Sequence, residues 1–286
     1  MVKANHHPIG IFDSGVGGIT ILQAIRQLLP DEELIFVADQ AHVPYGLRPL
    51  EQVQAFAEGI VNFLLSLHAK AIIVACNTAS AAALHYIRDI FPSVPIIGME
   101  PAVKPAAKNT NSGVIGVLAT QATFQGALYA SLVMKFSKGV TLIQDSCIGL
   151  VNQIEAGAVD TAETRRLLEK ILNPMLKAKM DTVVLGCTHY PFVSHLIREI
   201  VGETVEIIDP TFAVARQTER VLSEQGLLVG SLSDSYPLRF FTSASPKMLH
   251  HTIQRLPVND EIKRVTIKGL FWQETGAMAW ELQPYN

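Results

Sequence analysis

Two cysteines in this chain follow similar apolar segments. Residues 71–78 read AIIVACNT, and residues 182–189 read TVVLGCTH. Each segment is a run typical of a buried strand, followed by a small residue, a cysteine, short polar residues and a helical pattern. Ligands of open α/β sheets bind beyond the carboxyl ends of strands, and helix N-termini favour thiolates. We therefore interpret Cys76 and Cys187 as candidate reactive residues.

Two thiols on opposite sides of a cleft could act on one substrate carbon from both faces. Inverting a carbon that bears a hydrogen needs a base on one face and an acid on the other, and a matched pair performs either direction with the roles exchanged. One group must start as thiolate and the other as thiol, so their titrations would be coupled. The third cysteine, Cys147, lies in segment 145–149 (DSCIG) without this setting, and we expect it to be a core residue.

Three other interpretations of these cysteines stay open. Free cysteine is often a small buried hydrophobic residue without a chemical role. Zinc could be bound by Cys76, Cys187 and His189, but the chain has no C-x2-C pair and no HExxH motif, so we expect no metal. A nucleophilic cysteine with a histidine partner would leave the second matched cysteine without a function.

A glycine-rich segment, residues 9–20 (IGIFDSGVGGIT), reads as a strand, a turn and the start of a helix. This pattern is also typical of a dinucleotide-binding loop, in which Asp39 at the end of the next strand would accept hydrogen bonds from the ribose. However, Thr20 occupies the third glycine position, and Asp13 brings negative charge to the place where a pyrophosphate would bind. We favour a loop that approaches a small anionic ligand, with Asp13 and Ser14 pointing into the cleft. A simple turn role for Asp13 is the alternative.

The next strand is followed by a second polar loop, residues 38–46 (ADQAHVPYG). Its last three residues, Pro44, Tyr45 and Gly46, combine a rigid turn, a phenol and an exposed backbone N–H. We interpret them as a candidate clamp for a carboxylate.

Short apolar runs alternate with longer amphipathic segments along the chain, which predicts an α/β fold with parallel strands. The predicted strands are 9–13, 33–39, 71–76, 94–98, 114–119, 140–144, 182–186, 205–208, 238–242 and 264–270. The predicted helices are 19–29, 50–67, 80–90, 124–136, 161–176, 191–200, 212–224 and 246–255.

Prolines mark two seams in this pattern, at residues 99–105 and at the step from Asp209 to Pro210. A chain that crosses at both seams forms one domain from two segments and a second domain between them. We predict a first domain of residues 1–100 plus 211–286 and a second of residues 101–210, with a cleft between them.

Composition excludes several classes of protein. The chain has 286 residues with 49% hydrophobic and 17% charged residues, enough for a large core, and a net charge of −3 without a basic cluster argues against nucleic-acid binding. Residues 1–8 lack the apolar segment of a signal peptide, and we find no apolar run long enough to span a membrane. Three cysteines are few, which points to a reducing cytoplasm.

Together, these segments closely resemble the glutamate racemase family, cofactor-independent amino-acid racemases that supply D-glutamate for bacterial peptidoglycan. The resemblance extends from about residue 8 to residue 255, and residues 266–286 carry no matching motif. One block departs slightly, with Ala119 where the family often has glycine. The matching blocks are 12–18 (FDSGVGG), 39–46, 75–80 (ACNTAS), 116–123 (GVLATQAT) and 185–191 (LGCTHYP).

The resemblance implies two pseudo-symmetric parallel-sheet α/β domains with the active site in the cleft between them, and no cofactor. It implies that Cys76 and Cys187 are the acid/base residues, assisted by Asp13 and by the pair of His189 with Glu155. The substrate-binding positions that it implies are Asp13, Ser14, Pro44, Tyr45, Gly46, Asn77, Thr78, Thr120, Thr123, Thr188 and His189.

The resemblance also implies glutamate as the substrate, a cytoplasmic location and, as is common in such enzymes, a homodimer; we expect no nucleic-acid or membrane partner. Racemisation of aspartate or a hydantoin is the nearest alternative. A non-catalytic binding protein for acidic amino acids, with inert cysteines, and an NAD-dependent oxidoreductase are the alternatives from other classes.

Overall fold

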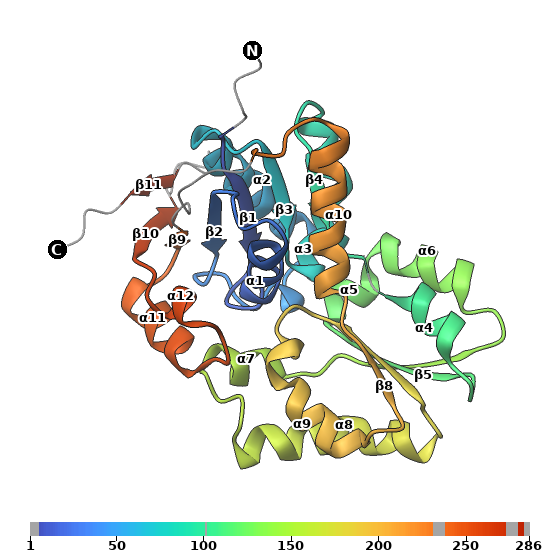
Figure 1. Cartoon of the computed structure of the whole chain (residues 1–286). Coiled ribbons are helices and arrows are strands. Elements are labelled where there is room, and N and C mark those ends of the chain that lie inside the picture. The colour runs from blue at the N-terminus through green and yellow to red at the C-terminus, as the bar shows by residue number, and fades with distance from the viewer. Residues whose placement is uncertain (1–5, 101, 231–237, 273–279, 283–286) are drawn as a thin grey trace.

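The computed structural model describes residues 6–100, 102–230, 238–272 and 280–282, the side chains of the last three excepted. The expectation about a signal peptide rests partly on residues 1–5, which lie outside the described residues. The chain forms two separate sheets, each covered by helices, as Figure 1 shows. The predicted α/β class is confirmed.

The first sheet has the strand order β11-β10-β9-β2-β1-β3-β4. All pairs are parallel except that of β10 and β11. Its strands are β1 (Ile9–Asp13), β2 (Leu34–Ala38), β3 (Ala71–Val74), β4 (Ile96–Gly98), β9 (Arg239–Thr242), β10 (Ile267–Trp272) and β11 (Trp280–Leu282). Its helices are α1 (Ile19–Leu28), η1 (Tyr45–Leu47), α2 (Leu50–Ser66), α3 (Asn77–Ile90), α10 (Thr211–Glu224), α11 (Pro246–Arg255) and α12 (Asp260–Lys263).

The second sheet has the order β6-β5-β7-β8, and all its strands are parallel. Its strands are β5 (Val114–Ala119), β6 (Thr141–Asp145), β7 (Thr182–Gly186) and β8 (Glu206–Ile208). Its helices are α4 (Val103–Asn109), α5 (Gln121–Gln125), α6 (Ala127–Phe136), α7 (Leu150–Glu155), α8 (Ala162–Lys177), η2 (Tyr190–Val193) and α9 (Ser194–Val201).

The two sheets repeat one arrangement. The order β2-β1-β3-β4 in the first corresponds to β6-β5-β7-β8 in the second, so β3 and β7, the strands before the two cysteines, are equivalent. The sheets use strands from residues 9–98 plus 239–282 and from residues 114–208. The predicted domain limits stay a prediction, and we refer below to the first half and the second half by these sheets.

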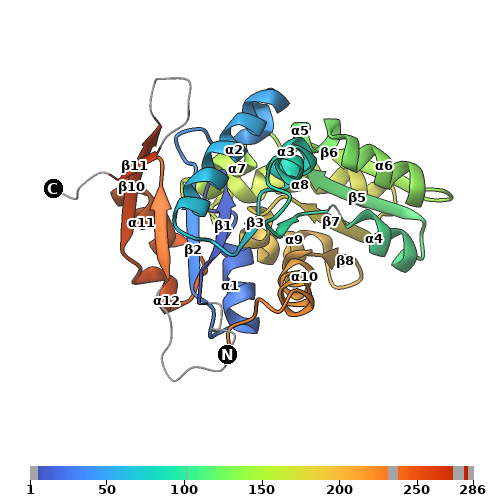
Figure 2. The ribbon, with the colours of Figure 1, turned by 90° about the horizontal axis from the view of Figure 1, so that it is seen from above.

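Helices cover both faces of the first sheet, as expected for parallel strands with nearly continuous apolar character. Figure 2 shows α1 and α10 on one face and α2 and α3 on the other. An apolar cluster that includes Ile11, Ile25 and Ala215 fills the first face and continues into the second half through Leu185. The two halves therefore share part of one core at the site.

The structure corrects several predicted elements. The predicted helix 80–90 begins earlier, at Asn77, because the Cys76 side chain caps it and accepts a hydrogen bond from the Ala79 N–H. The predicted helix 124–136 is two helices, because Gly126 is extended (φ −67°, ψ 139°). The predicted helix 191–200 starts as the short 3-10 helix η2. Helices α4, α7 and α12 and strand β11 were not predicted.

Among the described residues, no helix combines the length and the apolar character needed to cross a bilayer.

Candidate active site

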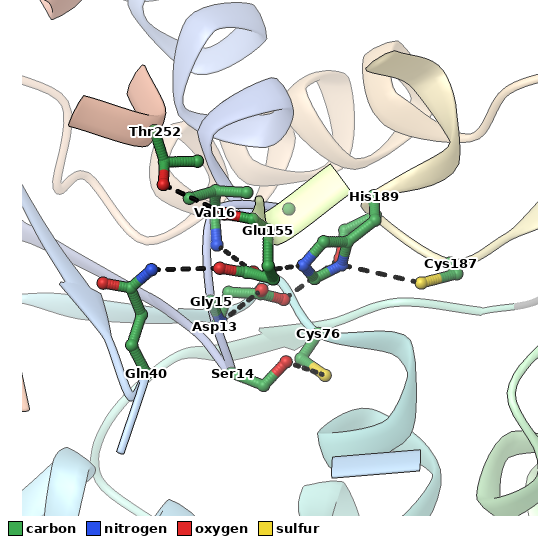
Figure 3. Close-up of polar contacts among 12 residues, drawn as sticks. Asp13, Ser14, Gly15, Val16, Gln40, Cys76, Glu155, Cys187, His189 and Thr252 are labelled. Carbon is green, nitrogen blue, oxygen red and sulfur yellow. Dashed lines mark hydrogen bonds and ion pairs between the residues drawn. The ribbon is translucent and has the colours of Figure 1, made fainter. Parts of the chain in front are cut away.

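The candidate residues come from loops that follow equivalent strands in the two halves. Cys76 follows β3 and Asp13 ends β1, whereas Cys187 follows β7 and Thr120 follows β5. Figure 3 shows Asp13, Cys76, Cys187 and their partners gathered in one place. The structure therefore brings both matched cysteines to a shared site, as the carboxyl ends of parallel strands predict.

Cys76 lies at the N-terminus of α3, at the end of the first sheet. Its side chain is 5% exposed, accepts from the Ala79 N–H (3.5 Å) and lies 3.8 Å from the Ser14 hydroxyl oxygen. Burial raises the pKa of this thiol, and the negative charge of Asp13 raises it further, against the lowering effect of the Ala79 N–H. This environment favours the neutral thiol of Cys76.

Cys187 has a different partner, a buried histidine. Its sulfur lies 3.7 Å from Nδ1 of His189, whose Nε2 lies 2.6 Å from Oε1 of Glu155. Burial lowers the pKa of His189, but Cys187 and Glu155 together outweigh burial and hold it well above the usual value. An imidazolium at His189 would donate to the Cys187 sulfur and to the Glu155 carboxylate at once. Cys187 itself is followed by a turn and η2, so the expected helix N-terminus at this cysteine was wrong.

Asp13 ends β1 in the first half and connects the two halves through a hydrogen bond from Thr188. Its carboxylate accepts from the Gly15 N–H (2.9 Å) and from the Thr188 hydroxyl (3.1 Å), and the side chain is fully buried. Burial raises the pKa of Asp13 above its usual value, although the nearby charge of His189 lowers it. Asp13 therefore makes a local turn contact with Gly15 and also accepts a hydrogen bond from the opposite half.

Three threonines also join the two halves, through contacts between their hydroxyl groups. The hydroxyl of Thr78, in the first turn of α3, lies 2.8 Å from that of Thr120 and 3.4 Å from that of Thr123. Thr120 also caps α5 by accepting from the Thr123 N–H. All three were predicted as substrate-binding positions, and the structure places them in one buried cluster.

The side chain of Asn77, in the first turn of α3, is buried. Neither its Nδ2 nor its Oδ1 finds a partner within the part of the chain that the structure describes. Buried amide groups are nearly always hydrogen-bonded, because an unpaired one loses its hydration without compensation. An orphaned amide one residue after Cys76 therefore points to a polar ligand.

The glycine-rich loop packs against residues of the second half, so it leaves no room for a phosphate. A β-carbon built on Gly15 would lie 1.8 Å from Oε1 of Glu155, and one on Gly17 would lie 2.5 Å from Nδ1 of His189. The Val16 N–H donates to Glu155 (2.7 Å). The loop's N–H groups are thus directed at protein carboxylates, which argues against the dinucleotide interpretation.

Comparison with known proteins identifies the family. The model of Asp/Glu/hydantoin racemases matches residues 19–218. The chain belongs to this family. It is 48% identical over 252 residues to the glutamate racemase of Pseudomonas paraeruginosa, covering 88% of this chain and 94% of that protein.

Solved structures agree with this assignment. Glutamate racemase from Francisella tularensis in complex with D-glutamate has a TM-score of 0.76 at 30% identity, covering 90% of this chain and 96% of that one. The Escherichia coli glutamate racemase in complex with L-glutamate and the activator UDP-MurNAc-Ala also has a TM-score of 0.76, at 31% identity, covering 87% of this chain and 95% of that one. The present chain is therefore a racemase, an isomerase.

The sequence did not indicate how this racemase holds its second loop. Asp39, considered above as a ribose acceptor, is fully buried and accepts from Tyr45 (2.6 Å) and Trp272 (3.0 Å), and lies 2.8 Å from Nδ1 of His42. The Tyr45 hydroxyl is therefore directed at Asp39. Burial, together with Asp39, raises the pKa of Tyr45 well above its usual value. The signal available in the sequence was only that Asp39 ends a predicted strand.

One small cavity borders the site, and a larger one lies away from it. A small cavity of about 40 Å³ lies beside the candidate clamp and is lined by Pro44, Gly46 and Thr120. A larger hollow of about 460 Å³ lies between α3, β4 and α10 and touches none of the predicted site residues. Within the described residues, no group of three or more His, Cys, Asp or Glu is arranged to hold a metal ion.

We expect Glu155→Gln to lower the pKa of His189. The substitution removes the negative charge that lies against Nε2, so Cys187 alone is left to oppose the lowering effect of burial on the pKa of His189. Nitrogen-15 NMR titration of His189 checks this. Glu199→Gln, on the exposed surface, is the control and should leave the titration unchanged; an equally unchanged titration in Glu155→Gln would contradict the assigned contact.

Proposed function

We propose that this racemase interconverts L- and D-glutamate with Cys76 and Cys187 as its two acid/base residues and without a cofactor. The observation that carries the proposal is that two buried thiols follow equivalent strands of two similar sheets and meet at one site, each with its own polar partners. Relatives with these folds are glutamate racemases, including one in complex with D-glutamate and one with L-glutamate.

The proposed cycle begins with Cys187 as thiolate and Cys76 as thiol. The thiolate removes the α-hydrogen as a proton, the electron pair of the C–H bond stays on the α-carbon, and the Cys76 thiol delivers a proton to the opposite face. The cycle ends with the proton on Cys187 and the charge on Cys76, which is the starting state for the opposite direction. His189 and Glu155 assist Cys187, and Asp13 lies beside Cys76.

The difficult step is forming a carbanion that no cofactor stabilises. Preorganised donors aimed at the substrate α-carboxylate offset its developing charge, and such electrostatic contributions are often the largest in catalysis. The proposed donors are the hydroxyls of Thr78 and Thr188 and the amide of Asn77, which has no hydrogen-bond partner among the described residues. Ser14, Thr120, Thr123 and the loop of Pro44, Tyr45 and Gly46 would contact the remaining polar groups of glutamate.

Incubating the purified protein with L-glutamate in heavy water, with no added cofactor, tests this function. We expect the optical signal to fall to zero as D-glutamate accumulates. The new enantiomer should carry deuterium at the α-carbon from the first turnovers, while unconverted substrate still carries hydrogen. Racemisation of aspartate or a hydantoin instead would change the substrate, and tight binding of glutamate without turnover would support the binding-protein alternative.

The supply of D-glutamate for peptidoglycan in the cytoplasm, expected from the resemblance, belongs to this proposal. Rescue of a bacterial strain that requires added D-glutamate would support it. The homodimer stays a prediction, which sedimentation of the purified protein tests.

A further inference from the structure

Gln40 makes a contact that none of the motifs explains. Its Nε2 donates to Oε2 of Glu155 at 2.9 Å, across 115 positions of sequence. Gln40 follows β2 in the first half, whereas Glu155 ends α7 in the second half. Its carbonyl oxygen accepts from the Thr242 hydroxyl of β9 at 3.2 Å. Since Thr242 holds the carbonyl end of the amide, the NH2 group faces Glu155, as Figure 3 shows.

The Glu155 carboxylate therefore has contacts in two directions. Its Oε1 contacts Nε2 of His189 and accepts from the Val16 N–H, while its Oε2 accepts from Gln40. Val16 and Gln40 both belong to the first half, whereas Glu155 and His189 belong to the second. The carboxylate that supports His189 is thus oriented from the opposite half of the molecule.

We propose that Gln40 is a positioning residue: it fixes the Glu155 carboxylate so that Oε1 meets His189, and it thereby completes the Cys187 base only when the two halves are together. This inference rests on the proposed two-thiol function. Within the described residues, the Gln40 side chain hydrogen-bonds to Glu155 and Thr242 and to none of the predicted substrate positions, so it acts through Glu155 and His189. Its effect should therefore fall on kcat more than on KM.

A purely structural link between the halves is the competing interpretation. The two interpretations differ for Gln40→Glu, which places a second carboxylate against Glu155. Titratable groups that act on Glu155 include His189 and Asp13, and Asp39 directly precedes Gln40 in the chain. Two carboxylates at this distance share one proton at low pH and repel each other at high pH. A positioning role therefore predicts that kcat of this variant rises relative to wild type as the pH falls.

The experiment compares Gln40→Met, which keeps the volume and removes the donor, with Gln40→Glu and a control, Gln54→Met. Gln54 is also part-buried and also donates one amide hydrogen bond, to the Ala82 carbonyl, away from Glu155. We expect Gln40→Met to lose about 10-fold in kcat at every pH with little change in KM, as is usual when a partner that orients a reacting group is removed. Gln54→Met should keep wild-type kcat.

Equal kcat in Gln40→Met and wild type, or a loss in Gln40→Glu that does not change with pH, would overturn the inference. If Gln40→Met fails to fold, as judged by circular dichroism, Thr242→Val takes its place, because it removes the hydrogen bond that holds the carbonyl end of the Gln40 amide. We expect a smaller loss of kcat in Thr242→Val. An unchanged kcat in that variant would overturn the inference. A wild-type protein that does not racemise glutamate would instead refute the proposed function.

Discussion

Cys76→Ser and Cys187→Ser are each expected to stop the interconversion of L- and D-glutamate, with a loss of at least about 10²- to 10⁴-fold in kcat, the usual contribution of a positioned acid or base. Serine keeps the shape of the side chain, but its hydroxyl is far less acidic than a thiol and cannot serve as the base. Racemisation followed from each pure enantiomer measures the loss.

The two variants should differ in a partial reaction. Cys76→Ser retains Cys187 with His189 and Glu155, so it should exchange the α-hydrogen of one enantiomer for solvent deuterium with hardly any inversion. Proton NMR of each enantiomer in heavy water detects this exchange. Cys147→Ser is the control, because Cys147 is buried against the backbone of Asp145 and has no role in the proposed cycle. Full racemase activity in either cysteine variant would exclude the two-thiol mechanism.

The sequence predicted the strands that carry the site well, because buried parallel strands are short, apolar and rich in β-branched residues. The similar segments around Cys76 and Cys187 predicted two equivalent loops, and the topology places both cysteines after equivalent strands. The ends of parallel strands are marked by the local sequence pattern. Reactive residues that directly follow a strand can therefore be predicted from the sequence alone.

The partners across the halves could not be predicted in this way. Glu155 lies at the end of α7, a short helix without a distinctive pattern, and Gln40 reads as an ordinary loop residue. Their contact depends on how the two halves pack, which local periodicity does not encode. The contact of Trp272 with Asp39 lies within the first half, and local pattern does not predict it because β10 joins the first sheet from far along the chain.

Gly15→Ala is expected to reduce kcat by about 10²-fold or more, although the residue makes no side-chain contact of its own. The added β-carbon would lie 1.8 Å from Oε1 and 2.7 Å from Cδ of Glu155, so the carboxylate must leave its place against His189 and the Val16 N–H. Overpacking of this kind costs about 1–3 kcal/mol of stability. Steady-state kinetics and thermal unfolding measure the two effects, with Gly230→Ala as the control because its β-carbon would meet nothing within 4 Å.

A second substitution separates this contact from any general need for glycine. Glu155→Asp shortens the side chain and leaves room for the new β-carbon, so the double variant Gly15→Ala with Glu155→Asp should lose less kcat than the two single losses combined. If the loop served instead to cradle a phosphate, or needed glycine only for its backbone, the two losses would multiply. A double variant that loses less kcat than the two single losses combined would show that positions 15 and 155 are coupled. Glycine would then be required at position 15 because the Glu155 carboxylate, from the second half, packs against the backbone of the first half there.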